Sequence, residues 1–384
     1  MTGRSWDIFC KVVDNYGDVG VCWRLARQLA SERGQYGESV RLWIDALEAL
    51  RRIWPDIDPV ALRQHCAGVE VRRWIDGVSP SADAIPHEVV IEAFGCDTPD
   101  VFVAAMAARN PPPVWINLEY LSAEAWVDDC HLLPSPHPRL PLIKHFFFPG
   151  FSRRAGGLLR EADLLSRRDA FGRDGDAQAR WWRSLGVDPS CAALKVSLFS
   201  YSNPAAEQLL RAWVQGDREV VCVVAEGVLR PEIRRALGAI PAASEAVVCD
   251  RLTLVVAPFV PQSSYDEMLW ACDLNFVRGE DSFVRAQWAA RPLVWQIYPQ
   301  KDGAHRPKLD AFVDRYADSL DPTITPAIRQ MFNAWNGDGD IVDAWSAIEA
   351  IVPVWTEGAK HWADALVQGD DLATSLARAV GEML

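Results

Sequence analysis

The sequence predicts an α/β protein made of two doubly wound, Rossmann-like domains that face a cleft. Three observations support this fold class: a length of 384 residues, an alternation of short apolar runs with helical patterns, and a break in that alternation at 150–175. A chain of this length exceeds one comfortable hydrophobic core, so two domains are expected. Alternating strands and helices are typical of parallel sheets with helices on both faces.

The first half of the chain, at 1–150, is predicted to form the first domain. It opens on an apolar strand at 6–13, followed by a helix at 19–33 whose apolar positions recur every three or four residues. A second helix is expected at 46–53. Further strands are predicted at 40–44, 69–74, 88–94, 114–118 and 145–148.

The alternation resumes after a connecting segment at 151–188 that is rich in Arg and Gly. The second domain is predicted at 189–330. Its strands are expected at 194–200, 220–225, 252–258, 274–277 and 293–298, and its helices at 205–214, 232–237, 264–271 and 283–290. From Lys308 onward the pattern is nearly all helical, and the helices at 331–384 can pack back on the first domain.

Composition excludes several classes of function. A net charge of -13 argues against a nucleic-acid-binding protein, which needs a dense basic surface. No apolar stretch reaches the roughly 20 residues that cross a bilayer, and the chain begins on a strand pattern rather than a signal peptide. The nine cysteines show no C-x-x-C spacing, so reduced core thiols are expected. A cytoplasmic protein with no metal site and no membrane partner is predicted.

The first segment that carries chemistry is the loop at 13–20, between a strand and a helix. It holds Asp14 and Asp18 together with Gly17 and Gly20, and it lacks the G-x-G-x-x-G pattern of dinucleotide-binding proteins. A carboxylate at the end of a strand can act as a general base. In the plainer alternative, Asp18 caps the helix and Asp14 starts an Asx-turn.

A second strand, turn and helix follow at 276–287. Asp281 or Ser282 falls at the expected N-cap, so the helix N-terminus can hold a diphosphate, with Arg278 as a fixed positive charge. Glu280 cannot bind phosphate but suits sugar hydroxyls. An ordinary cap beside a surface Arg and Glu is the alternative.

Two further strand ends carry aromatic residues. Phe259 with Gln262 can stack on a nucleobase and bind its polar edge, and Phe199 with Tyr201 has a similar position. A core Phe beside a solvent-exposed Gln is an equally good interpretation.

These segments together resemble the EarP family, the bacterial protein-arginine rhamnosyltransferases that modify translation elongation factor P. The likeness covers essentially the whole length, and it is strongest at 6–10, 13–21, 23–29 and 278–282. It implies a GT-B fold and a metal-independent, inverting transfer from dTDP-β-L-rhamnose to an arginine of elongation factor P, without a cofactor. The modified factor then relieves polyproline stalling.

The resemblance also assigns roles. The domain at 1–150 binds the acceptor and the domain at 189–330 binds the nucleotide sugar. Asp14, Asp18 and Glu280 are the required acids, with Asp18 favoured as the base and Asp14 as the residue that holds the guanidinium. Asn15, Tyr16 and Gly17 complete the acceptor loop. The implied donor-binding residues are Phe199, Tyr201, Phe259, Gln262, Arg278, Glu280, Asp281, Ser282 and Tyr298.

Two other functions remain open at this point. One is a GT-B glycosyltransferase with a lipid or small glycan acceptor, which shares the donor site and differs at the acceptor. The other is a non-catalytic nucleotide-binding regulator, in which Asp14 and Asp18 only shape the loop.

Overall fold

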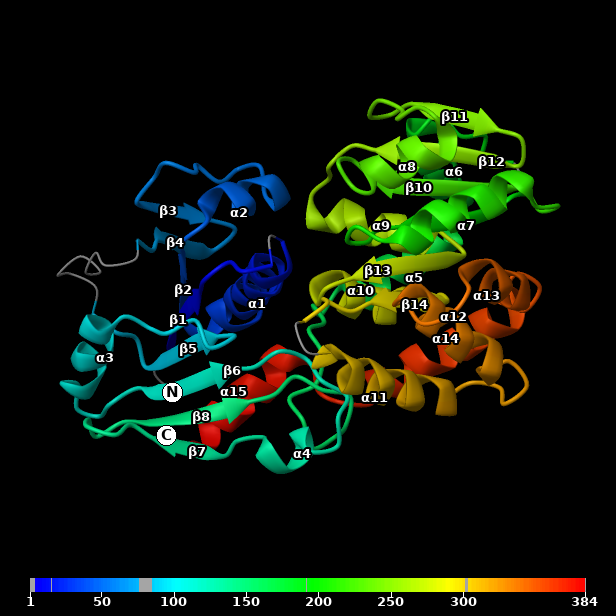
Figure 1. Cartoon of the computed structure of the whole chain (residues 1–384). Helices are drawn as coiled ribbons and strands as arrows, with labels where there is room; N and C mark the ends of the chain where they lie inside the picture. The colour runs from blue at the N-terminus through cyan, green and yellow to red at the C-terminus, as the bar shows by residue number, and fades with distance from the viewer. Residues whose placement is uncertain (1–3, 15, 76–84, 191, 301–302, 384) are drawn as a thin grey trace. The chain divides into compact units, whose positions relative to one another are not determined.

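The structure, a computed structural model, describes residues 4–14, 16–75, 85–190, 192–300 and 303–383. The chain divides into two compact units, Met1–Ala162 with Val367–Leu384 and Asp163–Leu366 (Figure 1). These boundaries differ from the predicted ones, because 151–162 lies in the first unit and the helices at 331–366 lie in the second.

Within the described residues, the first unit is built on an eight-stranded sheet in the order β3-β4-β2-β1-β5-β6-β8-β7. Its strands are β1 (Ser5–Cys10), β2 (Ser39–Ile44), β3 (Arg63–Cys66), β4 (Val69–Arg73), β5 (Val89–Ala93), β6 (Val114–Leu118), β7 (Pro134–Pro136) and β8 (Ile143–Phe147). The six central strands of this order, β4-β2-β1-β5-β6-β8, pair in parallel. The edge strands β3 and β7 pair antiparallel with their neighbours. The helical segments are α1 (Gly17–Arg33), η1 (Gly34–Tyr36), α2 (Leu47–Ile53), α3 (Asp100–Ala107), α4 (Val127–Cys130) and α15 (Leu372–Met383).

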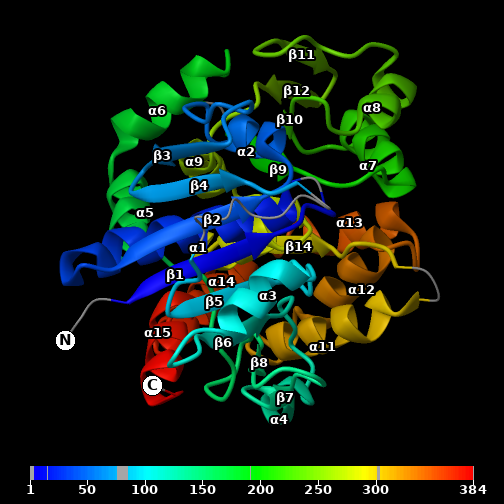
Figure 2. The same ribbon diagram turned by 90° about the vertical axis from the view of Figure 1, so that its left-hand side faces the viewer.

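The central strands of this unit are almost wholly apolar because they lie in its core. All residues of β5 and β6 are buried, as expected for parallel strands covered on both faces. On one face Phe9 stacks on Trp43 at 5.5 Å between ring centroids and meets Phe102 of α3 edge-on at 4.8 Å. Figure 2 shows α3 in front of β5 and β6.

The chain connections of the first sheet reverse direction between β1 and β5. Helix α1 leads from β1 to β2 on one side of this point, and α3 leads from β5 to β6 on the other. Because such crossovers are right-handed, the two helices lie on opposite faces of the sheet. Open α/β sheets bind ligands at this switch point, beyond the carboxyl ends of the strands. The loop that follows β1 lies there.

The last helix, α15, packs on α1 within the first unit. Gln28 of α1 is buried, and its Nε2 donates to the carbonyl of Arg160 and to Asp371 Oδ1, both at 2.9 Å. Asp371 Oδ1 also accepts the N–H groups of Ala373 and Thr374, which lie in the first turn of the helix. The C-terminal helix is therefore fixed to the unit that begins the chain.

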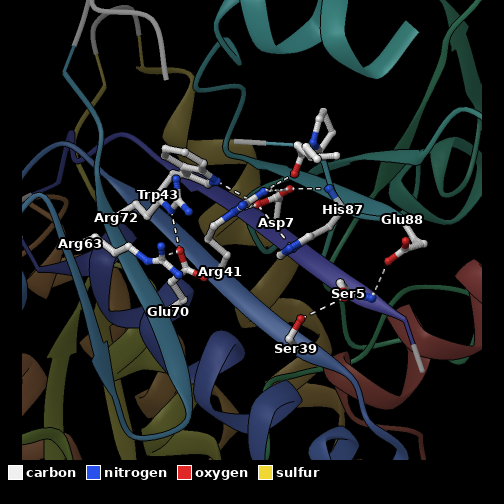
Figure 3. Close-up of polar contacts among 12 residues, drawn as sticks. Ser5, Asp7, Ser39, Arg41, Trp43, Arg63, Glu70, Arg72, His87 and Glu88 are labelled. Carbon is white, nitrogen blue, oxygen red and sulfur yellow. Dashed lines mark hydrogen bonds and ion pairs between the residues drawn. The ribbon is translucent and has the colours of Figure 1, made fainter. Parts of the chain in front are cut away.

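A buried ion pair joins β1 to β2 (Figure 3). Asp7 is fully buried and meets Arg41 through two bonds, Oδ1 to Nε at 2.5 Å and Oδ2 to Nη2 at 2.8 Å. Trp43 Nε1 and the backbone N–H of His87 donate to the same carboxylate, each at 2.9 Å. Arg41 also donates to the carbonyl of Ile85 at 2.8 Å. Since both charges are hydrogen-bonded, their burial is tolerated, and the pair fixes the residues that lead into β5.

The second unit has a six-stranded sheet within the described residues, in the order β11-β12-β10-β9-β13-β14. Its strands are β9 (Leu194–Leu198), β10 (Val220–Ala225), β11 (Ala246–Cys249), β12 (Leu252–Ala257), β13 (Leu274–Arg278) and β14 (Leu293–Gln296). The helices between and before them are α5 (Leu164–Arg173), α6 (Gly175–Ser184), α7 (Pro204–Gln215), α8 (Arg230–Leu237), α9 (Gln262–Ala271) and α10 (Asp281–Ala289). After the sheet come α11 (His305–Asp318), α12 (Thr325–Trp335), α13 (Ile341–Ile348) and α14 (Val352–Val367).

This sheet also has a switch point, between β9 and β13. Helix α7 leads from β9 to β10 on one side, and α10 leads from β13 to β14 on the other. The predicted donor residues Phe199 and Tyr201 follow β9 directly. Arg278 ends β13, and Ser282 lies in the first turn of the next helix. They therefore lie where a doubly wound sheet binds its ligand.

Three edge strands of the two sheets lie outside the strands that the sequence predicts. Strands β3, β7 and β11 are antiparallel to their neighbours. They are three or four residues long and partly exposed, so they give no continuous apolar run in the sequence. None of the described helices is both long and apolar enough to cross a membrane.

Candidate functional site

The predicted site residues fall into two sets, one in each unit. Asp14 and Asp18 follow β1 in the first unit, whereas Glu280 and all the predicted donor residues belong to the second. Two of the three predicted acids thus come from the first unit and one from the second. Among the described residues, no group of three or more His, Cys, Asp and Glu side chains is placed to hold a metal ion.

Asp18 lies in the first turn of α1 and is 2% exposed. Its Oδ2 accepts the backbone N–H groups of Val13 at 2.8 Å and Asp14 at 2.9 Å, so the carboxylate holds the preceding loop against the helix. Tyr16 occupies the N-cap position and makes no side-chain capping bond. The alternative in which Asp18 is the helix cap is therefore wrong.

The environment of Asp18 favours proton uptake. Burial raises the pKa of its carboxyl group, and the negative charge of Asp14 acts in the same direction. The N–H groups of Val13 and Asp14 and the hydroxyl of Tyr120 lower the pKa and oppose this shift. A carboxylate whose pKa is raised toward neutral pH is better suited to general-base catalysis.

The loop before α1 depends on a glycine. The Gly17 N–H donates to the Asp14 carbonyl at 2.7 Å. A Cβ at Gly17 would lie 2.7 Å from Asp14 Oδ2, which is closer than such atoms normally come. The Tyr16 hydroxyl accepts a hydrogen bond from Arg52 Nη1 at 3.3 Å. Asn15, the remaining member of the predicted acceptor loop, lies outside the described residues.

In the second unit, an arginine and three aromatic residues come together at the switch point. The guanidinium carbon of Arg278 lies 4.5 Å from the ring centroid of Phe199 and 4.4 Å from that of Tyr201, within cation–π distance. Tyr201 meets Tyr298 edge-on at 5.3 Å. The Tyr201 N–H donates to Gln296 Oε1 at 2.8 Å, which fixes the loop after β9. Four of the predicted donor residues are thus linked by successive contacts, from Phe199 through Arg278 and Tyr201 to Tyr298.

The start of α10 differs from the prediction. The helix begins at Asp281, and Glu280 is the N-cap residue without a side-chain capping bond, so neither Asp281 nor Ser282 is the N-cap. Ser282 instead binds the strand before it. Its hydroxyl donates to the Arg278 carbonyl and accepts the Arg278 N–H at 3.1 Å. Gly279 takes a φ of +58°, which closes the turn between strand and helix.

Helix α9 brings Gln262 to the first turn of α10. Gln262 is its first residue, is buried, and donates from Nε2 to Asp281 Oδ2 at 3.3 Å. Phe259 is half-buried in the loop between β12 and this helix. The predicted residues from β12, β13 and the helices that follow them therefore belong to one region of the second unit.

Two supporting features of this region were not predicted. Tyr265 of α9 packs edge-on against Phe199 at 5.7 Å. Burial raises the pKa of Tyr265 well above its ordinary value. Asp266 forms a bidentate, buried ion pair with Arg285 of α10, with distances of 2.7 and 2.8 Å. The sequence offers one sign of the role of Tyr265: it is three residues from Gln262, so both lie on one face of the helix.

Two open cavities of about 360 Å³ each lie elsewhere in the second unit. One includes Asp273, which immediately precedes β13 and so marks the amino-terminal edge of the sheet. In the other, Arg168 donates to the carbonyl of Trp288 at 3.0 Å and Arg291 to that of Trp270 at 3.5 Å. These guanidinium groups bind the carbonyl ends of α10 and α9, a structural role.

Comparison with known proteins finds long matches. A family model for Elongation-Factor P (EF-P) rhamnosyltransferase EarP matches residues 6–380. A protein-arginine rhamnosyltransferase of Pseudomonas aeruginosa is 46% identical over 381 residues, which are 99% of this chain and 100% of the relative. Another from Pseudomonas putida is also 46% identical, over 97% of each chain.

A solved structure is similar as well. It concerns EarP-mediated arginine glycosylation of translation elongation factor EF-P, has a TM-score of 0.69 at 32% sequence identity, and matches over 99% of this chain and 100% of its own. With the two doubly wound sheets described above, this likeness confirms the predicted GT-B fold class.

Proposed function

We propose that this chain, which belongs to the EarP family of elongation factor P (EF-P) rhamnosyltransferases, transfers L-rhamnose from dTDP-β-L-rhamnose to an arginine side chain of EF-P. The observation that carries the proposal is the end-to-end likeness to protein-arginine rhamnosyltransferases at 46% identity. The modified factor is proposed to relieve polyproline stalling. Because translation takes place in the cytoplasm, a cytoplasmic location is part of the proposal.

The second unit is proposed to bind the donor. Phe259 stacks on thymine and Gln262 binds its polar edge, while Phe199, Tyr201 and Tyr298 line the nucleotide site. Arg278 and the first N–H groups of α10 carry positive charge toward the diphosphate, and Asp281 and Ser282 lie beside them. These groups stabilise the negative charge that develops on the departing dTDP, which is the task a metal ion performs in other enzymes.

The first unit is proposed to bind and activate the acceptor. A guanidinium has a pKa above about 12 and no free lone pair, so it must be oriented and lose a proton as it reacts. Asp14, within the loop of Asn15, Tyr16 and Gly17, holds the cation. Asp18, with its raised pKa, takes the proton late in the reaction.

The transfer is proposed to be a single inverting displacement. A guanidinium nitrogen forms a bond to C1 of the sugar while the C1–O bond to the diphosphate breaks, and that electron pair leaves with dTDP. The proton of the attacking nitrogen passes to Asp18, and a β-linked donor gives an α-linked product. Glu280 is proposed to bind sugar hydroxyls. The chemistry requires that the acids of the first unit and the donor site of the second act on the same pair of substrates.

The test is to incubate the protein with dTDP-β-L-rhamnose and EF-P and to measure the intact mass of EF-P. A gain of one deoxyhexose is expected. An unchanged mass, with dTDP released only when a lipid or glycan acceptor is added, would favour the alternative acceptor class. If dTDP binds but is never released from the donor with any acceptor, the chain is a nucleotide-binding regulator.

Phe259→Ala is expected to weaken dTDP binding by about 1–3 kcal/mol, the range for stacking of a base on an aromatic ring. Calorimetric titration with dTDP measures the change. Phe259→Leu serves as the matched variant, because it keeps an apolar side chain but removes the stacking surface, and it should lose a similar amount. Affinities equal to wild type in both variants would place Phe259 outside the nucleotide site.

A further inference from the structure

Three loops meet at the switch point of the first unit, after β1, β5 and β6. Tyr120 lies two residues beyond β6, and its hydroxyl donates to Asp18 Oδ1 at 3.3 Å. The other carboxylate oxygen, Oδ2, already accepts two backbone N–H groups. Both oxygens of Asp18 are therefore held, one by the loop after β1 and one by the loop after β6.

Tyr120 is itself held in place by Phe94, which follows β5. The two rings are stacked at 4.4 Å with 14° between their planes. The Phe94 N–H donates to the Leu118 carbonyl at 2.7 Å, and Asn117 Oδ1 accepts the Gly95 N–H at 3.2 Å. The loop after β5 is thus bonded to β6, the strand that leads to Tyr120.

Phe94 has an unusual backbone. Its φ is +58°, in the left-handed region. Residues other than glycine, and bulky ones above all, rarely adopt this conformation. Such conformations carry an energetic cost and concentrate at functional sites, where surrounding contacts maintain them. In this conformation the Phe94 ring stacks on Tyr120.

We propose that Tyr120 is a positioning residue for Asp18: its hydroxyl orients the ionised carboxylate toward the acceptor, and Phe94 fixes the tyrosine ring. The inference rests on the proposed function, in which Asp18 takes the acceptor proton. Tyr120 is 37% exposed, whereas Asp18, which its hydroxyl contacts, is only 2% exposed.

The neighbouring ionisable groups determine how the pH profile should respond. Asp14, in the same loop, raises the pKa of Asp18, and the Tyr120 hydroxyl lowers it. The hydrogen bond with Cys22 and burial raise the pKa of Cys10 of β1 well above its ordinary value, and the charges of Asp18 and Asp45 add to this shift, so Cys10 stays neutral. Loss of the tyrosine hydroxyl should therefore raise the pKa of Asp18, because one stabilising bond to the ionised form disappears.

Tyr120→Phe tests the proposal, because it removes the hydroxyl and keeps the stacked ring. We expect kcat to fall about three- to tenfold, the size expected for loss of one long hydrogen bond to a charged group. KM for dTDP-rhamnose should stay unchanged, since the proposed donor residues lie in the other unit. The acid limb of kcat/KM against pH should move to higher pH, because this limb reports the base of the free enzyme.

Tyr36→Phe is the matched control, since Tyr36 is an exposed tyrosine of the same unit that contacts Arg33. It should leave kcat and the pH profile unchanged. Asp18→Asn, measured alongside, separates the two claims. If Asp18→Asn is inactive and Tyr120→Phe matches wild type in turnover and pH profile, only the positioning role is wrong. If Asp18→Asn keeps normal turnover, the base assignment in the proposed function falls, and the positioning role falls with it.

Discussion

Replacing Asp18 by Asn is expected to lower kcat at least roughly 100-fold, as loss of a general base does. The amide keeps the size of the side chain but cannot take the proton that leaves the acceptor guanidinium. Binding of dTDP should be unchanged, because the proposed nucleotide site lies in the second unit. Steady-state transfer to EF-P measures the first quantity, and calorimetric titration with dTDP measures the second.

Asp100→Asn is the control for this result. Asp100 also lies in the first turn of a helix of the first unit, but that helix is α3 rather than α1. Its replacement should leave both kcat and dTDP affinity at wild-type values. If Asp18→Asn also turned over at a near-normal rate, Asp18 would not be the base.

The second large effect is expected from Asp266→Asn, which breaks the ion pair with Arg285 between α9 and α10. Both side chains are 1% exposed. Removing one charge leaves the other buried without compensation, at a cost of about 3–5 kcal/mol. For a unit of this size, that corresponds to a fall of roughly 6–20 °C in the midpoint of thermal unfolding. Weaker dTDP binding should accompany it, because Gln262 and Ser282 lie in the first turns of these two helices.

Differential scanning calorimetry of the full chain measures this change. Asp314→Asn is the matched variant, because Asp314 pairs with Arg329 at the surface and its side chain is 64% exposed. Exposed pairs contribute little to stability. A fall for Asp266→Asn no greater than that for Asp314→Asn would show that the buried pair does not hold the two helices.

Buried parallel strands could be predicted from the sequence with accurate bounds. Strands β6 and β10 lie at the predicted residues, because both are runs of mostly apolar residues that are buried almost throughout. Edge strands could not. In β3 the residues are Arg63, Gln64, His65 and Cys66, which alternate between exposed and half-buried. These residues form a strand because they pair with β4, and no local sequence pattern predicts that pairing.

The candidate site could be predicted as far as its loops. Strand ends at 13–20 and 278–282 stand out in the sequence, and the topology places both at switch points. Contacts between distant loops could not be predicted. Tyr120 is 102 positions from Asp18 in the chain, and its approach depends on the strand order β1-β5-β6. The assignment of Asp281 or Ser282 as a helix cap failed because Ser282 binds the preceding strand instead.

Fragment-ion mass spectrometry of EF-P, after incubation with this protein and dTDP-β-L-rhamnose, tests most directly whether the chain glycosylates arginine. We predict one deoxyhexose on the side chain of a single arginine with the wild-type protein, and none with Asp18→Asn. Absence of the sugar with the active protein, or its attachment to a serine, threonine or lysine, would contradict the account.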